Sequence, residues 1–258
     1  MATVNVDRKL YPTDLTDEQW LVIKPLFTGM REYKWDKREL TNAVLYLVDS
    51  GCKWRLLPHD FPPYSTVHSF YRRARLSGLW DRILETLVKL TREKEGRNPE
   101  PSYVLIDSQS AKTVGPSEER GYDGGKKTKG RKRHIVVDTM GNLLYIAIHA
   151  ANIHDTKSGI LVAQPACEKY PSIERFCADA GYRGTFVIEL KEKCGIGVDI
   201  SEKIKPHEWE KVPWRWIVER TFSWLNHSRR LSKDYEILCD SAAAMVKLSH
   251  IHTLLKRL

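Results

Sequence analysis

Two aspartates of this chain stand where catalytic carboxylates are often found. Asp107 directly follows the apolar run 103–106, and Asp179 directly follows the run 173–178. Functional side chains in open α/β sheets tend to emerge at the carboxyl ends of strands. A single aspartate after a strand is more often a turn former, so the hypothesis depends on the pair. We expect the two to meet at one edge of a sheet.

A third carboxylate lies much later, on a predicted helix. The segment 213–231 contains neither Gly nor Pro after its first residue and is long enough for about four to five helical turns. On a helix, Glu219 shares one polar stripe with Arg215, Ser223, Asn226 and Arg230. From this segment alone, a solvated surface helix with a salt-bridged Glu219 is an adequate explanation. The two aspartates add the alternative that this helix packs across the strand ends.

Three clustered carboxylates would need cations. Ionised carboxylates about 4 Å apart repel by about 4 kcal/mol per pair at an effective dielectric constant of about 20. Such a cluster persists with raised pKa values or with bound metal, and oxygen ligands favour Mg²⁺ or Mn²⁺. Two such ions can hold the attacking and departing oxygens of an in-line phosphodiester displacement. Asp107, Asp179 and Glu219 are therefore our candidate metal ligands.

The charge of the chain indicates a polyanionic partner. The net charge is +9, and the excess is concentrated in two segments, 112–133 and 203–233, each with eight Lys or Arg against three acids. The first segment belongs to a predicted Gly- and Lys-rich loop over residues 108–133, directly after the strand that ends in Asp107. We expect its basic side chains to hold DNA phosphates, namely Lys126, Lys127, Lys129, Arg131, Lys132 and Arg133.

Composition and the first residues point to a cytoplasmic protein. The five cysteines are an odd number without a C-x-x-C spacing, which favours reduced thiols. The N-terminus lacks the apolar run of a signal peptide, and no stretch approaches the length of a membrane span. We expect no membrane partner.

Residues 1–95 read as a helical region. Predicted helices begin near Thr13 or Thr16, near Asp36, after Ser65 and near Trp80, and Gly51 and Gly78 end the second and the third. A helix, a proline-bearing turn region and a basic helix resemble a helix-turn-helix module, although a bundle with a solvated basic face fits as well. The candidate DNA contacts on the basic helix are Arg72, Arg73 and Arg75.

After a linker at 96–101, the pattern changes to mixed α/β. The expected order is a strand, a β-hairpin, a helix, a strand, a helix, a strand and two helices. The expected ranges are 103–106, 134–137 with 143–148, 155–169, 173–178, 185–193, 197–200, 213–231 and 242–258.

Three motifs carry a resemblance to a known family. They are Ile-Asp107-Ser, Ala-Asp179-Ala-Gly-Tyr and Arg215-Trp-Ile-Val-Glu219-Arg-Thr-Phe-Ser-Trp-Leu, and the stretches 51–63 and 121–134 add to them. Together they resemble the DDE transposases of bacterial insertion sequences, and most closely insertion-sequence family five. The resemblance covers nearly the whole chain.

The resemblance implies a fold and an activity. The fold would be an RNase H-like catalytic domain at 102–258 with a mixed five-stranded sheet, behind a small all-α helix-turn-helix-like domain. The protein would bind the terminal inverted repeats of its element, cut phosphodiester bonds at the ends and join the 3′-hydroxyls to target DNA. The family's catalytic residues would be Asp107, Asp179 and Glu219 with two Mg²⁺ or Mn²⁺ ions. Joining two ends implies a homodimer on DNA.

One family signature is only partly present. In the pattern Y-x2-R-x3-E-x6-K, Arg215 and Glu219 fit, but Val212 stands in the place of Tyr and Asn226 in the place of Lys. Arg229 and Arg230 could supply the missing cation about one helical turn later. Tyr182, Trp216 and Trp224 could stack on an unpaired base near the cut, although for Trp224 a position in the packed core is the favoured interpretation.

Two other functions remain open from the sequence. A structure-selective nuclease or resolvase on the same fold would cut DNA without joining it. A DNA-binding regulator that has lost catalysis would do neither, although three intact acidic positions argue against that reading.

Overall fold

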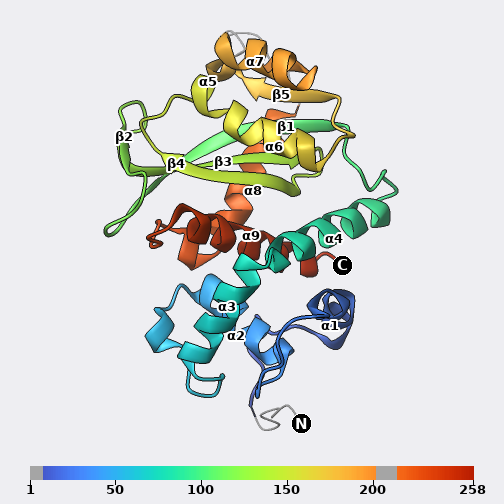
Figure 1. Ribbon diagram of the computed structural model, residues 1–258, viewed down its shortest axis with the longest axis vertical. Coiled ribbons are helices and arrows are strands. Elements are labelled where there is room, and N and C mark those ends of the chain that lie inside the picture. Colours follow the sequence, from blue (N-terminus) through green and yellow to red (C-terminus); the bar gives the residue numbers. More distant parts are fainter. Residues whose placement is uncertain (1–7, 202–213) are drawn as a thin grey trace.

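The N-terminal helices begin and end largely where the sequence signals lie. The computed structural model describes residues 8–201 and 214–258 (Figure 1). Thr16 caps α1 and forms a capping box with Gln19, while Asp36 caps α2 and Gly51, with φ of 70°, ends it. The bounds are α1 Asp17–Ile23, η1 Lys24–Phe27, α2 Lys37–Ser50, η2 Trp54–Leu56, α3 Tyr64–Leu76 and α4 Leu79–Lys94. Ser65 lies inside α3 and does not cap it, because that helix already begins after Pro63.

The following part is a curled mixed sheet of six described strands. They are β1 Tyr103–Lys112, β2 Gly121–Asp123, β3 Thr128–Asp138, β4 Leu143–Ala150, β5 Arg175–Asp179 and β6 Gly197–Ser201. The order is β2-β3-β1-β5-β6, and β4 also pairs with β3. β3 is antiparallel to β1 and β4, whereas β1, β5 and β6 are mutually parallel neighbours.

The expectation of a basic loop over residues 108–133 is wrong for residues 108–112, 121–123 and 128–133, which lie in strands. β1 continues to Lys112 and pairs with β3 as far as Gly130, and β2 adds a short strand beside the start of β3. Local composition is polar and Gly-rich, but long antiparallel pairing decides the conformation of these residues. The sheet therefore has six strands where five were expected.

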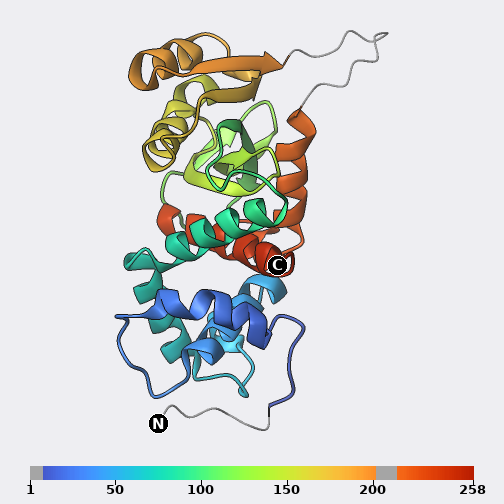
Figure 2. The same ribbon diagram turned by 90° about the vertical axis from the view of Figure 1, so that its right-hand side faces the viewer.

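Helices cover both faces of the sheet. α6 packs on β3 and β4, and α8 packs on β1 and β5 from the opposite side (Figure 2). The remaining bounds are α5 Asp155–Ser158, α6 Ile160–Lys169, η3 Ala180–Tyr182, α7 Thr185–Cys194, α8 Arg215–Asn226, η4 Arg229–Leu231 and α9 Cys239–Leu255. The helix expected over 213–231 thus ends at Asn226, and Val212 and Pro213 lie outside the described residues.

The C-terminal helix joins the two parts of the molecule. α9 lies between α1–α3 and the sheet, beside α4, and contacts α2, α4 and β4 (Figure 1). Gln19 donates from its side chain to the Leu255 carbonyl at 2.9 Å, and the Leu143 amide donates to His250 at 3.0 Å. In residues 8–201 and 214–258, no helix has both the length and the apolar composition to cross a membrane.

Candidate active site

The structure brings Asp107 and Asp179 to one pocket at the edge of the sheet. β1 and β5 are parallel, and Leu105 pairs with Cys177, so the same register carried two residues on sets the aspartates opposite each other. Both line a small pocket, together with Ser201 at the end of β6 and Arg215 on α8. The expected meeting of the two strand-end carboxylates is present.

Burial and neighbouring charge act on Asp107. Loss of solvent is the main cause that raises the pKa of its carboxyl to about 6, and the charges of Asp179 and Asp155 raise it further. The Ser108 amide, which donates to the carboxylate at 2.7 Å, and the Lys126 charge oppose that rise. The hydrogen bond and the lysine therefore do not fully offset the cost of ionising the buried Asp107 carboxyl.

Asp179 is held by the turn that follows it. Its Oδ1 accepts a hydrogen bond from the Gly181 amide at 2.8 Å, at the start of η3. A Cβ atom at position 181 would lie 2.9 Å from the same oxygen, so the turn favours glycine there. The same hydrogen bond therefore fixes both the orientation of the Asp179 carboxylate and the backbone conformation of the turn.

The pocket fits a hard divalent cation by its donor set. Two carboxylates supply oxygen ligands, and the Ser201 hydroxyl is a buried polar atom of the pocket that has no hydrogen-bond partner among residues 8–201 and 214–258. Asp107, Asp179 and Ser201 can hold such an ion. Among residues 8–201 and 214–258, however, no group of three His, Cys, Asp or Glu side chains is close enough to form a metal site.

Glu219 stands apart from that pair. Its side chain is exposed and forms an ion pair with the Nε of Arg215 at 3.1 Å, one turn earlier on α8. Arg215 and Val218 line the pocket from α8, and Glu219 follows directly after Val218. The structure thus joins two of the three predicted ligands and leaves the third on the adjacent helix.

The turn between β2 and β3 and the first residues of β3 carry exposed lysines near the pocket. Lys126, Lys127 and Lys129 are all exposed. Lys126 donates from Nζ to the Ser108 carbonyl at 3.0 Å, and its own amide donates to Asp123 at 3.0 Å. Asp123 in turn accepts from Ser110 of β1 at 2.6 Å. These contacts fasten the turn to the strand that carries Asp107.

The remaining basic residues of this segment require a correction. Arg131, Lys132 and Arg133 are buried in β3, so they are not available to phosphates. Arg131 has no exposed side-chain surface and forms an ion pair with Asp234 at 2.7 Å. Lys132 forms one with Asp155 at 2.9 Å. Their burial follows from the pairing of β3, which the expected loop did not include.

Arg230 is corrected for the same reason. It is buried and forms an ion pair with Glu236 at 2.6 Å, so it does not supply a free cation beside Glu219. Arg229 is exposed. On α3, Arg72 and Arg73 are exposed, whereas Arg75 is half-buried with its Nη1 3.7 Å from Asp240.

Near the pocket, the sequence analysis missed the role of one residue and assigned a wrong role to another. Asp155, at the start of α5, accepts hydrogen bonds from Ser108 at 2.8 Å and from Lys132 at 2.9 Å. Tyr182 is 1% exposed, so the expectation that it stacks on a base is wrong. Asp155 was identified only as a helix start, and neither burial nor partner could be read from that signal.

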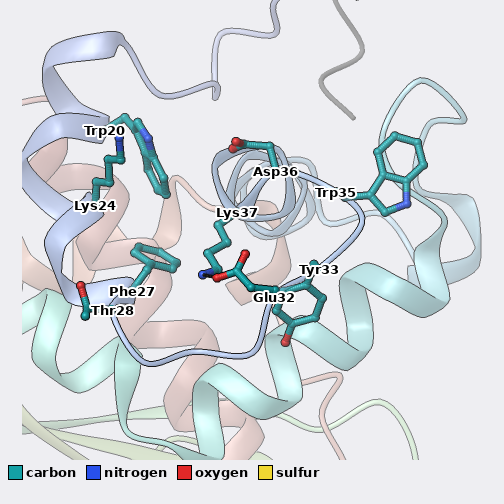
Figure 3. Close-up of a pocket in the computed structure, with 9 residues that line it drawn as sticks. All are labelled: Trp20, Lys24, Phe27, Thr28, Glu32, Tyr33, Trp35, Asp36 and Lys37. Carbon is teal, nitrogen blue, oxygen red and sulfur yellow. Dashed lines mark hydrogen bonds and ion pairs between the residues drawn. The ribbon is translucent and has the colours of Figure 1, made fainter. Parts of the chain in front are cut away.

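A second cavity, of about 280 Å³, lies in the helical region away from the sheet (Figure 3). Aromatic rings of Trp20, Phe27 and Tyr33 line it. Its acidic groups have structural partners, since Glu32 forms an ion pair with Lys37 at 2.8 Å and Asp36 caps α2. We therefore place the chemistry at the sheet.

Comparisons with known proteins agree with the motifs. Residues 98–254 match the family described as "Transposase DDE domain", and residues 15–84 match "Putative transposase of IS4/5 family". A putative transposase for insertion sequence element IS402 of Burkholderia cepacia is 30% identical over 194 residues, which cover 68% of this chain and 87% of that protein. No solved structure matches the chain.

Proposed function

Since the chain belongs to the insertion-sequence transposases with a DDE domain, of the IS4/5 kind, we propose that it cuts and joins DNA at the Asp107–Asp179 pocket. It binds the terminal inverted repeats of its element, cleaves phosphodiester bonds at the ends and transfers the 3′-hydroxyls to target DNA. The observation that carries this proposal is the meeting of two carboxylates at the carboxyl ends of adjacent parallel strands.

The order of the strands supports an RNase H-like catalytic domain. Three antiparallel strands, β4-β3-β1, continue into the parallel strands β5 and β6, with helices on both faces. We assign catalysis to 102–258, DNA-end binding to the helix-turn-helix-like region 1–95, and the role of linker to 96–101.

The ligands in the proposed site are Asp107, Asp179 and Glu219, holding two Mg²⁺ or Mn²⁺ ions. Such ions activate the attacking oxygen and stabilise the departing one. Glu219 has to turn from Arg215 toward the pocket, and an exposed ion pair of this kind contributes only about 0–1 kcal/mol. Its release frees Arg215, which already lines the pocket, for a phosphate.

Two exposed surfaces serve as DNA contacts. Lys126, Lys127 and Lys129 follow the backbone beside the cut, and Lys126 replaces the lysine that the family signature has at Asn226. Arg72 and Arg73 on α3 contact the element end, and the exposed Arg229 on η4 is a further contact. A homodimer brings two ends together for joining.

Mg²⁺-dependent nicking of DNA that carries the element ends tests the proposal. Wild-type protein should nick this DNA, and Asp179→Asn should not. Asp199→Asn is the matched control, because Asp199 lies on the neighbouring strand β6 outside the pocket and pairs with Arg175. Equal nicking by wild type and Asp179→Asn would refute the site, and cutting without transfer of a pre-cut end would indicate a nuclease.

A further inference from the structure

A buried chain of hydrogen bonds runs beneath the two aspartates. The Tyr182 hydroxyl lies 2.7 Å from Nε2 of His134, and Nδ1 of His134 lies 3.2 Å from Nε2 of His149. Nδ1 of His149 lies 3.1 Å from the Ala150 carbonyl. Tyr182, His134 and His149 are 1%, 0% and 4% exposed. The proposed chemistry uses none of the three.

The carbonyl at the end fixes the direction of every bond. Ala150 can only accept, so His149 carries its proton on Nδ1 and accepts at Nε2. His134 then donates from Nδ1 and accepts at Nε2, which leaves the Tyr182 hydroxyl as the donor to His134. Both imidazoles are neutral in this arrangement, in agreement with burial lowering the pKa of His134 to about 3.

The chain spans the strand that carries Asp107. Tyr182 closes η3, the turn that holds the Asp179 carboxylate after β5, and His134 lies on β3. β1 separates β5 from β3 in the sheet, and His134 pairs with Ser108, the residue after Asp107. We propose that the Tyr182–His134–His149 chain is a positioning device that fixes the Asp179 turn against β1 and so sets the spacing of the two metal-binding carboxylates.

This inference rests on the proposed function, because it concerns the same pair of ligands. Tyr182 and the two histidines touch neither metal nor DNA, so they are positioning residues and act through Asp179. Groups that orient metal ligands from outside typically contribute about 10- to 100-fold to metal affinity. Removal of the Tyr182 hydroxyl should therefore weaken metal binding by about tenfold while the carboxylates remain.

Mn²⁺ binding to the free protein, measured by electron paramagnetic resonance of the unbound ion, tests this role without any activity assay. Tyr182→Phe should raise the dissociation constant about tenfold, and thermal unfolding without metal reports its stability. Tyr170→Phe is the matched control, since Tyr170 is also 1% exposed but lies at the end of α6. It should bind Mn²⁺ as wild type does.

A second pair of variants covers the case in which Tyr182→Phe does not fold. His134→Gln keeps an acceptor for the tyrosine and should retain most of the affinity, whereas His134→Leu should lose about tenfold. Wild-type affinity in Tyr182→Phe or in His134→Leu would overturn the positioning role. Equal losses in His134→Gln and His134→Leu would also overturn it. If Asp179→Asn binds Mn²⁺ as wild type does, the proposed metal site itself fails.

Discussion

The strand ends and helix α8 hold their acidic residues in different ways. Asp107 and Asp179 are placed by parallel pairing of β1 and β5, and backbone amides bind both carboxylates. Glu219 projects from α8 and has an exposed ion pair with Arg215. A strand fixes a side chain through its neighbours along both edges, whereas a helix fixes only its packed face. In the proposed site, two of the ligands would therefore be preformed, and the third would have to leave its ion pair with Arg215.

The basic residues show the same contrast. Arg131 belongs to a paired strand, is fully buried and forms two hydrogen-bonded contacts with Asp234. Lys126 lies in the turn between β2 and β3, Lys129 lies near the start of β3, and both are exposed. Lys129 pairs only with the short strand β2, whereas Arg131 pairs with β1 and with β4. Residues a few positions apart in one basic run are thus buried or exposed according to how far the sheet extends on both sides of them.

Replacement of the carboxylates gives the largest expected effect. Asp107→Asn and Glu219→Gln should each lower Mg²⁺-dependent cleavage by about 10³-fold, the order expected when one electrostatic stabiliser of a transition state is lost. The two variants should differ in the metal-free protein. Asp107→Asn replaces a residue that lines the pocket, whereas Glu219→Gln replaces an exposed side chain outside it. Single-turnover cleavage of end DNA measures the first effect. Wild-type cleavage by Glu219→Gln would show that Glu219 is not part of the active site.

Removal of a buried cation should unfold the protein more readily. Arg131→Met leaves Asp234 buried and unpaired, so it should lower the free energy of unfolding by about 3–5 kcal/mol. Lys129→Met at the exposed start of β3 should change the free energy of unfolding by no more than about 0.5 kcal/mol. Urea denaturation followed by circular dichroism compares the two. Similar losses of unfolding free energy in the two variants would contradict the distinction between the buried and the exposed residues of this basic segment.

The pH dependence of stability should reveal Asp107. Its pKa is raised to about 6 in the folded protein, so the folded state binds the proton more tightly than the unfolded one. Metal-free stability should fall by about 2 kcal/mol as the pH rises from 4 to 6 because of this group, and Asp107→Asn should lack that fall. Added Mg²⁺ binds the ionised form and should restore stability above about pH 6. Thermal unfolding at a series of pH values measures both effects, and identical profiles for wild type and variant would refute them.

Neighbouring lysines should separate catalysis from general DNA affinity. Lys126 contacts the backbone beside Asp107, so Lys126→Ala should lower kcat/KM for cleavage about fivefold, which corresponds to about 1 kcal/mol. Lys127→Ala should weaken DNA binding most at low salt, where the lysine–phosphate attraction is least screened, and leave the cleavage rate of bound DNA unchanged. Single-turnover rates at saturating protein distinguish the two. Equal cleavage rates would remove the special role of Lys126.

The smallest expected effect concerns the helical region. Arg72→Ala with Arg73→Ala should reduce the slope of log affinity against log salt concentration by about two, since each exposed arginine neutralises one phosphate. Arg75→Ala should change it less, because Arg75 already lies near Asp240. Fluorescence anisotropy with labelled end DNA gives these slopes. An unchanged slope in the double variant would move end recognition away from α3.

Local signals in the sequence predicted most helices and the meeting of the aspartates. Thr16, Asp36 and Gly51 act within one helical turn, so caps and stops could be read directly. The two aspartates follow apolar strands that had to be buried side by side. The family resemblance, confirmed by the comparisons, covers the same motifs.

Features that depend on distant partners could not be read in this way. The burial of Arg131 requires Asp234, about a hundred residues later, and the burial of Tyr182 requires His134 on another strand. Polar residues in β1 and β3 favoured a loop until their mutual pairing was known. The sequence also provides no local signal for the rotamer of Glu219, which decides between a salt bridge and a metal ligand.

The placement of α9 has a consequence for how the molecule is made. Helix α9, residues 239–255, is synthesised after every strand and helix that it contacts. It nevertheless packs against α2 and α4 as well as against β4. A nascent chain that has emerged only as far as β6 therefore lacks one of the elements that connect its helical region to its sheet. Another connection, the buried ion pair of Arg92 on α4 with Asp138 on β3, needs no residue beyond β3. The contacts of α9 are thus the last of these connections to form.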